Sequence, residues 1–98
     1  MHRDALINRL VSLRPALTAE GVMHMTLFGS RARGDALANS DIDLALEVRP
    51  ESPFSILDLV GVEQIIADAT GLPANAFMRR ALDSAFLGMI EREGVTVF

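Results

Sequence analysis

Residues that could bind a phosphate and a metal ion lie close together in the stretch LFGSRARGDALANSDIDLAL, residues 27–46. It holds a Gly-Ser pair at Gly29 and Ser30 and, after ten intervening residues, the carboxylates of Asp41 and Asp43. Glycine lets a backbone approach a ligand closely, and a helix N-terminus presents free N–H groups that suit phosphate. The Gly-Ser pair therefore indicates either a phosphate site or an ordinary turn from a strand into a helix.

Two arginines and a second serine accompany the Gly-Ser pair. Arg31 and Arg33 could neutralise phosphate charge, because a guanidinium group can bind two oxygens of one phosphate at once. The alternative is that both arginines lie on the surface beside an ordinary turn. Ser40 precedes the first aspartate, where it either orients that carboxylate or simply begins a strand.

The two aspartates are expected on one face of a strand, because side chains two residues apart point the same way. Neighbouring ionised carboxylates repel each other, and Mg²⁺, which prefers oxygen ligands, would relieve that repulsion. An isolated Asp-x-Asp pair is more often the polar face of an exposed edge strand. Its combination with the Gly-Ser turn favours a site in which Asp41 and Asp43 hold two Mg²⁺ ions against nucleotide phosphates.

The spacing of apolar residues predicts the elements that carry these groups. A helical pattern in the first part of the chain should break near Pro15, because proline disturbs a helix interior. In chain order we expect helix 3–19, strand 22–28, a turn and short helix at 29–36, strand 41–48, helix 54–70, strand 74–79, helix 82–93 and strand 95–98. This order predicts an α/β domain, residues 1–98, with helices packed on one small mixed sheet.

Other segments carry further expectations about burial. Ile42, Leu44, Leu46 and Val48 should face a core, and the methionines at positions 23, 25, 78 and 89 should fill it. The Arg79-Arg80 pair could contact an acidic partner or a phosphate, but the sequence favours its interpretation as a solvated strand end. Helix 54–70 has no clean polar face, and a helix that is apolar nearly all round is usually buried on several sides. That helix therefore indicates contact with a partner or with a second copy of the chain.

Composition limits the classes of function. The chain has 98 residues, a net charge of −4, nine arginines, and neither lysine, cysteine, tryptophan nor tyrosine. These features exclude a catalytic lysine and a thiolate metal site, and they argue against direct binding of nucleic acid. No apolar run approaches the length of a membrane span, and the N-terminus lacks a signal-peptide pattern. We expect a cytoplasmic protein without membrane contact.

The segment FGSRARGDALANSDIDLAL resembles the signature of minimal nucleotidyltransferase domains of the DNA polymerase β superfamily, which is Gly-Ser, ten residues, then Asp-x-Asp. The order of elements fits over nearly the whole chain and implies the polymerase β-like nucleotidyltransferase fold. The resemblance implies Mg²⁺-dependent transfer of a nucleoside monophosphate from a nucleoside triphosphate to an acceptor. Gly29 and Ser30 would hold the triphosphate, and Asp41 and Asp43 would hold two Mg²⁺ ions.

The same resemblance implies a partner. Small stand-alone members of this group resemble the antitoxin half of a toxin–antitoxin pair whose toxin is a helical HEPN-type ribonuclease. Some members silence that toxin by adding AMP to a tyrosine. The resemblance thus implies ATP as the substrate and a HEPN-type toxin as the acceptor.

The sequence departs from the pattern at one position. The family carries a third carboxylate on a later strand, and Gly71 before that strand and Leu82 after it align Asn75 with this position. An amide, native or introduced, offers one carbonyl oxygen but cannot act as a base at neutral pH. Loss of a general base typically lowers a rate by ~10²–10⁴-fold. Three alternatives stay open: an active enzyme, a weakened form that neutralises its partner by binding it, and a homodimer that binds nucleotide without turnover.

Overall fold

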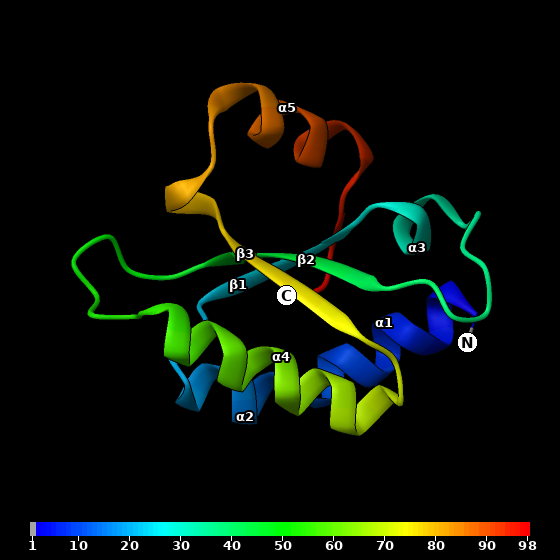
Figure 1. The fold of residues 1–98 in the computed structure, drawn as a ribbon, viewed down its shortest axis with the longest axis horizontal. Helices are drawn as coiled ribbons and strands as arrows, with labels where there is room; N and C mark the ends of the chain where they lie inside the picture. Colours follow the sequence, from blue (N-terminus) through cyan, green and yellow to red (C-terminus); the bar gives the residue numbers. More distant parts are fainter. Residues whose placement is uncertain (1) are drawn as a thin grey trace.

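The structure, a computed structural model, describes residues 2–98 as four strands and the helices that cover them (Figure 1). The strands are β1 (His24–Phe28), β2 (Ile42–Glu47), β3 (Ala74–Met78) and β4 (Val95–Thr96). They form one mixed sheet in the order β3-β2-β1-β4. β1 pairs antiparallel with β2 and β4, whereas β2 pairs parallel with β3.

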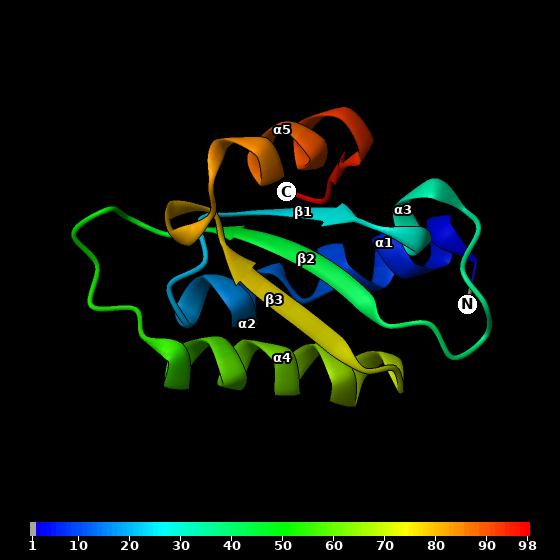
Figure 2. The ribbon, with the colours of Figure 1, turned by 45° about the horizontal axis from the view of Figure 1, so that its top comes forward.

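The helices cover the two faces of the sheet unequally (Figure 2). They are α1 (Arg3–Ser12), α2 (Arg14–Ala19), α3 (Ser30–Arg33), α4 (Ile56–Thr70), a 3₁₀ turn η1 (Arg79–Ala81) and α5 (Ser84–Glu93). α1, α2 and α4 lie on one face, and α5 lies alone on the other. The predicted break of the first helix is confirmed, since α1 ends at Ser12 and Pro15 occupies the first turn of α2.

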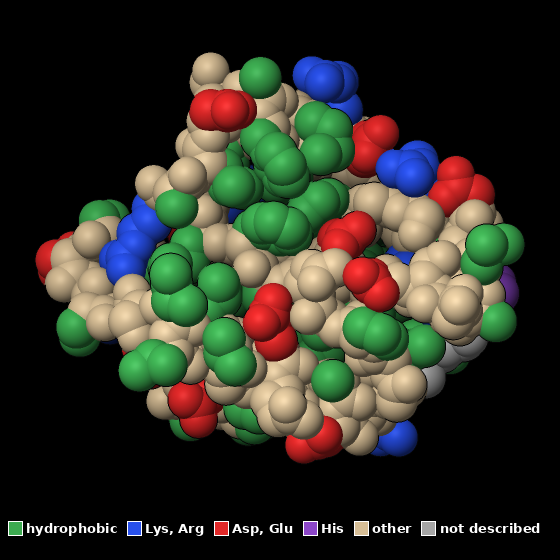
Figure 3. All heavy atoms as spheres, viewed as in Figure 1, with side chains coloured by type: hydrophobic (Ala, Val, Ile, Leu, Met, Phe, Trp, Pro, Cys, Tyr) green, Lys and Arg blue, Asp and Glu red, His purple; other side chains and the backbone are tan. Residues whose placement is uncertain are grey.

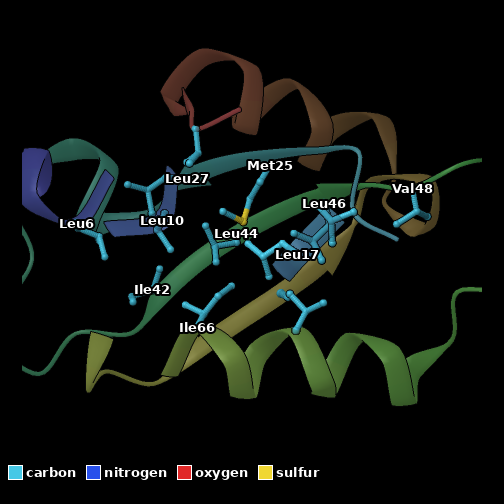
Figure 4. Packing of buried hydrophobic residues seen from close by; sticks show 14 of the residues in the cluster. Leu6, Leu10, Leu17, Met25, Leu27, Ile42, Leu44, Leu46, Val48 and Ile66 are labelled. Carbon is cyan, nitrogen blue, oxygen red and sulfur yellow. The ribbon is translucent and has the colours of Figure 1, made fainter. Parts of the chain in front are cut away.

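The main core lies between the sheet and the three helices α1, α2 and α4 (Figure 4). Ile42, Leu44 and Leu46 of β2 are fully buried there, and Val48 is 5% exposed, as the alternation predicted. Burying a Leu or Ile side chain of this kind contributes about 1.5–3 kcal/mol. Their partners include Leu6, Leu10, Leu17, Val62 and Ile66.

A second apolar cluster lies under α5, on the opposite face of the sheet. Phe28, Ala45 and Ile90 are buried in it. The rings of Phe28, Phe77 and Phe86 pack against one another with centroids 5.7–5.8 Å apart. β1 is consequently buried on both faces, although its sequence alternates as a half-exposed strand would.

α4 buries one side and leaves an apolar surface on the other. Ser55 and Asp58 form a capping box at its start, and Gly71 ends it in the left-handed conformation (φ 73°). Val62 and Ile66 face the core. We define the α4 patch as Ile56, Leu57 and Val60, which are 71%, 83% and 52% exposed.

The interpretation of the Arg79-Arg80 pair as a solvated strand end is correct only in part, because Arg80 is exposed but both guanidinium groups are bound within the protein. Arg79 donates a hydrogen bond of 3.0 Å to the hydroxyl oxygen of Thr26. Arg80 donates hydrogen bonds of 2.7–3.1 Å to the backbone carbonyl oxygens of Arg49, Pro50, Ser52 and Phe54. These carbonyls belong to the loop that follows β2, where the carbonyl of Arg49 also accepts from the N–H of Ser52, and the guanidinium of Arg80 supplies donors to the loop.

The expectation that all four internal methionines fill the core is correct only in part. Met25 is fully buried, and Met78 and Met89 pack against the two clusters. Met23 is 42% exposed. It precedes β1 and lines an open pocket beside α2, where no element covers it.

Among residues 2–98, none of the helices has the length and hydropathy that a transmembrane span requires.

A pair of glycine substitutions tests this packing. A Cβ at Gly94 would collide with the backbone oxygen of Ile90 and come within 2.6 Å of Thr26 Cγ2, so Gly94→Ala should destabilise the protein by about 1–3 kcal/mol. Gly61 lies inside α4 with nothing within 4 Å of such a Cβ, so Gly61→Ala should stabilise it by about 0.5–1 kcal/mol. Urea unfolding measures both changes. A gain in stability for Gly94→Ala would contradict the packing of α5 against β1.

Candidate functional site

The residues predicted to do chemistry meet at one edge of the sheet, where β1 ends and β2 and β3 begin. Antiparallel pairing of β1 with β2 places Phe28 opposite Asp43. Parallel pairing of β2 with β3 places Asp43 opposite Asn75. Figure 3, which views the molecule as Figure 1 does, shows acidic side chains near its middle, beside an apolar area over α5 and the neighbouring strands.

Asn75 lies between the two aspartates. Its Nδ2 donates one hydrogen bond of 2.9 Å to Asp41 Oδ2 and another of 3.2 Å to Asp43 Oδ1. The structure thus brings the amide to the carboxylates, as the alignment on Gly71 and Leu82 required. Its effect on catalysis stays a prediction.

Gly29 brings the turn into direct contact with Asp43. Its backbone has φ 74° and ψ −158°, which favours glycine. A Cβ built on Gly29 would lie 2.5 Å from Asp43 Oδ2. A side chain at this position would therefore displace the carboxylate, and glycine is required both for the conformation and for the space.

Ser30 begins α3 immediately after this contact. The carbonyl oxygen of Gly29 accepts hydrogen bonds of 3.1 Å from the N–H groups of Ala32 and Arg33. The first N–H groups of a helix have no acceptor within the helix, so the turn offers donors to an anion. Gly29 and Ser30 are both partly exposed, which leaves this side of the turn accessible.

Arg31 binds backbone carbonyls of the loop that leads from α3 to Asp41. The residue is only 4% exposed. Its Nε and Nη2 donate to the carbonyl oxygen of Ser40 at 3.2 and 2.9 Å, and Nη2 also reaches the carbonyls of Leu37 and Ala38 at 3.3 and 3.2 Å. The sequence did not indicate this structural role, because the charge alone pointed to phosphate. A contact between Arg31 and phosphate stays a prediction.

Ser40 and Arg33 are also engaged in contacts within the protein. The hydroxyl of Ser40 accepts a hydrogen bond of 2.8 Å from the N–H of Leu37, so this side chain closes the loop. Arg33 donates hydrogen bonds of 3.2 Å to the carboxylates of Asp35 and Glu93. The hydrogen bond and charge of Asp35, followed by the charge of Glu93, raise the pKa of Arg33 above its ordinary value. Arg33 thereby ties α3 to the end of α5.

Aromatic side chains form a cluster beside the carboxylates. Phe77 follows Asn75 by two residues on β3 and therefore shares its face of the sheet. Phe28 is opposite Asp43, and Phe86 of α5 packs on both rings. The sequence placed Phe86 on an apolar helix face but did not predict this aromatic cluster, because the cluster depends on the strand pairing.

The oxygen atoms available at this point suit a hard divalent cation. The carboxylate oxygens of Asp41 and Asp43 converge on one point, where the Asn75 amide now lies. Mg²⁺ binds through one or two carboxylates and keeps its other positions for water and phosphate oxygens. Within residues 2–98 no group of three or more Asp, Glu, His or Cys side chains could hold a metal, so the carboxylates that could hold a cation here are the pair Asp41 and Asp43.

The chain is similar in sequence to known proteins. Residues 6–93 match the nucleotidyltransferase domain family. Over 77 residues the chain is 32% identical to the protein adenylyltransferase MntA of Thermococcus cleftensis, covering 79% of this chain and 76% of that protein.

Solved structures agree on the fold. A minimal nucleotidyltransferase has a TM-score of 0.81 at 23% identity, with 97% of this chain and 95% of that chain covered. A toxin–antitoxin complex with AMP-PNP has a TM-score of 0.78 at 20% identity, with coverage of 94% and 72%. The complex of a tri-AMPylated HEPN toxin with its MNT antitoxin from Shewanella oneidensis has a TM-score of 0.72 at 16% identity, with coverage of 98% and 71%.

The predicted mixed sheet and polymerase β-like nucleotidyltransferase fold are thus confirmed. Because the family match spans residues 6–93 and the identity to MntA extends over most of both chains, this chain belongs to the nucleotidyltransferase domain family.

Proposed function

We propose that this chain is a Mg²⁺-dependent antitoxin that transfers AMP from ATP to a HEPN-type toxin. The observation that carries the proposal is the contact between the Gly29 turn and the Asp41–Asp43 pair, which joins a candidate phosphate site to a candidate metal site. The relative named a protein adenylyltransferase, the similar toxin–antitoxin complex with AMP-PNP and the similar complex of an AMPylated HEPN toxin support this choice of nucleotide and acceptor. A cytoplasmic location belongs to the same proposal.

The chain's own residues have distinct parts in this reaction. The carboxylates of Asp41 and Asp43 would hold two Mg²⁺ ions, which would neutralise negative charge that develops during the transfer. The Gly29-Ser30 turn orients the outer phosphates. The acceptor hydroxyl forms a bond to the α-phosphorus, the bond from that phosphorus to pyrophosphate breaks, and the hydroxyl proton passes to water. Asn75 cannot take that proton at neutral pH, so the transfer is slow.

Substitution at Asn75 tests the enzymatic part of the proposal. The protein is incubated with Mg²⁺, α-labelled ATP and the product of the adjacent gene, and label on protein is followed. Asn75→Asp should transfer label about 10²-fold faster, because it supplies a base and a third ligand. Asp41→Ala should transfer none.

The matched control for this experiment is Asn8→Asp, which makes the same chemical change on the exposed surface of α1 and should leave the rate unaltered. If Asn75→Asp were no faster than the original chain, a missing base at this position would not explain its rate.

Substitution at Gly29 tests the nucleotide site. Gly29→Ala should weaken the binding of Mg-ATP at least about tenfold, or about 1.4 kcal/mol, because its Cβ displaces Asp43. Gly34→Ala is the control: Gly34 also has a positive φ, of 83°, but a Cβ there meets nothing within 4 Å. Both variants carry backbone strain, which is larger at Gly29 because its ψ of −158° lies outside the left-handed helical region that Gly34 occupies, and only Gly29→Ala also carries the collision. If titration calorimetry gave Gly29→Ala and Gly34→Ala the same affinity for Mg-ATP, the Gly29–Asp43 contact would not contribute to nucleotide binding.

The second candidate function is neutralisation by complex formation, with nucleotide bound and little turnover. It is favoured by the amide at position 75 and by the α4 patch, whose three large apolar side chains are more than half exposed. Exposed apolar patches of this kind mark surfaces for association. A HEPN-type toxin is the proposed occupant, and a second copy of the chain is the alternative.

Charged substitutions on the α4 patch test this candidate. Leu57→Glu with Val60→Glu should abolish co-elution with the adjacent gene product in size-exclusion chromatography, because burial of unpaired carboxylates is unfavourable. Leu37→Glu changes an equally apolar residue that is 73% exposed in the loop after α3, and it should leave the complex intact. Retention of the complex by the double variant would place the interface elsewhere.

A further inference from the structure

The amide of Asn75 occupies the point at which the carboxylates converge. Its Nδ2 carries two hydrogens, and each is directed to a different carboxylate, Asp41 Oδ2 at 2.9 Å and Asp43 Oδ1 at 3.2 Å. Ionised carboxylates only accept hydrogen bonds, so the NH₂ end of the amide must face them. Asn75 therefore presents donors, and not its carbonyl oxygen, to the place where a cation would bind.

This arrangement relieves the same repulsion that a cation would relieve. Asp41 immediately precedes β2 and Asp43 lies on it, and both carboxylates reach the same Nδ2 of Asn75, so their negative charges oppose each other at short range. Donor hydrogens carry partial positive charge, and hydrogen bonds to charged groups are stronger than those between neutral groups. A carboxylate at position 75 would instead add a third negative charge.

The amide and a cation compete for the same oxygens. A metal ion held between Asp41 Oδ2 and Asp43 Oδ1 would need the space in which Nδ2 now lies, 2.9 and 3.2 Å from these two oxygens. Asp43 cannot easily withdraw, because its Oδ2 rests against the backbone of Gly29. The group that must move is the amide of Asn75.

We propose that the Asn75 side chain is a built-in substitute for the cation, which positions both carboxylates in the metal-free protein and is displaced when a divalent cation binds. This inference rests on the metal site of the proposed function. Its consequence is that the carboxylate pair binds a free cation more weakly than it would without the amide. Asn75 is a positioning residue in this role.

Nuclear magnetic resonance of the unaltered protein tests the displacement directly. The chain has only four side-chain amides, those of Asn8, Asn39, Gln64 and Asn75, so their NH₂ signals are readily assigned. Addition of Mg²⁺ should move the Asn75 signals toward those of the exposed amide of Asn8, in step with the backbone signals of Asp41 and Asp43. Movement of the aspartate signals with no movement of the Asn75 amide would overturn the inference and leave the metal site standing.

Affinity for Mn²⁺ tests the competition. Electron paramagnetic resonance of free Mn²⁺ should show that Asn75→Ala binds the ion about tenfold more tightly than the original chain, a difference of about 1.4 kcal/mol. Asn8→Ala is the control and should not change the affinity. Weaker binding by Asn75→Ala would show that the amide oxygen is a metal ligand, and equal binding would show that the amide does not compete; either result overturns the inference. Because neither experiment contains nucleotide or partner, absence of AMP transfer would not affect its outcome.

Discussion

The approach of Gly29 to Asp43 depends on the register between β1 and β2. Phe28 is opposite Asp43 in that register, so the residue after Phe28 reaches the carboxylate. The register is held from the other face of the sheet, where Leu27 and Leu44 are fully buried. A shift by one residue would turn these leucines toward α5 and the aspartates toward the core. Packing on one face of the sheet therefore fixes the positions of Gly29 and Asp43 on the other face.

The sequence predicted the parts of the site that depend on local pattern. The alternation of β2 located Asp41 and Asp43 on one face, since the side-chain period of a strand is fixed by its geometry. The Gly-Ser turn followed from the change between strand and helix. Asn75 was located because Gly71 ends α4 and so sets the start of β3. Each of these features needs only a few consecutive residues to be recognised.

Features that depend on distant segments were not predictable in the same way. Arg31 and Arg80 bind backbone carbonyls of loops, and the path of a loop is known only when the elements at both ends are placed. The charge of a side chain does not indicate such acceptors, so the sequence predicted phosphate as the partner of Arg31 and solvent as the partner of Arg80. The burial of β1 on both faces likewise became visible only when α5 was placed over the sheet.

The unequal cover of the sheet leaves the amide at position 75 in contact with both carboxylates at the accessible end of the strands. α5 closes the face above Phe28 and Phe77 but leaves the carboxylates at the strand ends accessible. Two accessible carboxylates this close need a donor or a cation nearby to offset their repulsion. In the structure Asn75 supplies that donor, and under our proposals a bound cation takes its place. The side chain that positions the carboxylates without metal is then also the one that cannot accept the proton of the attacking hydroxyl, so both effects depend on the same amide.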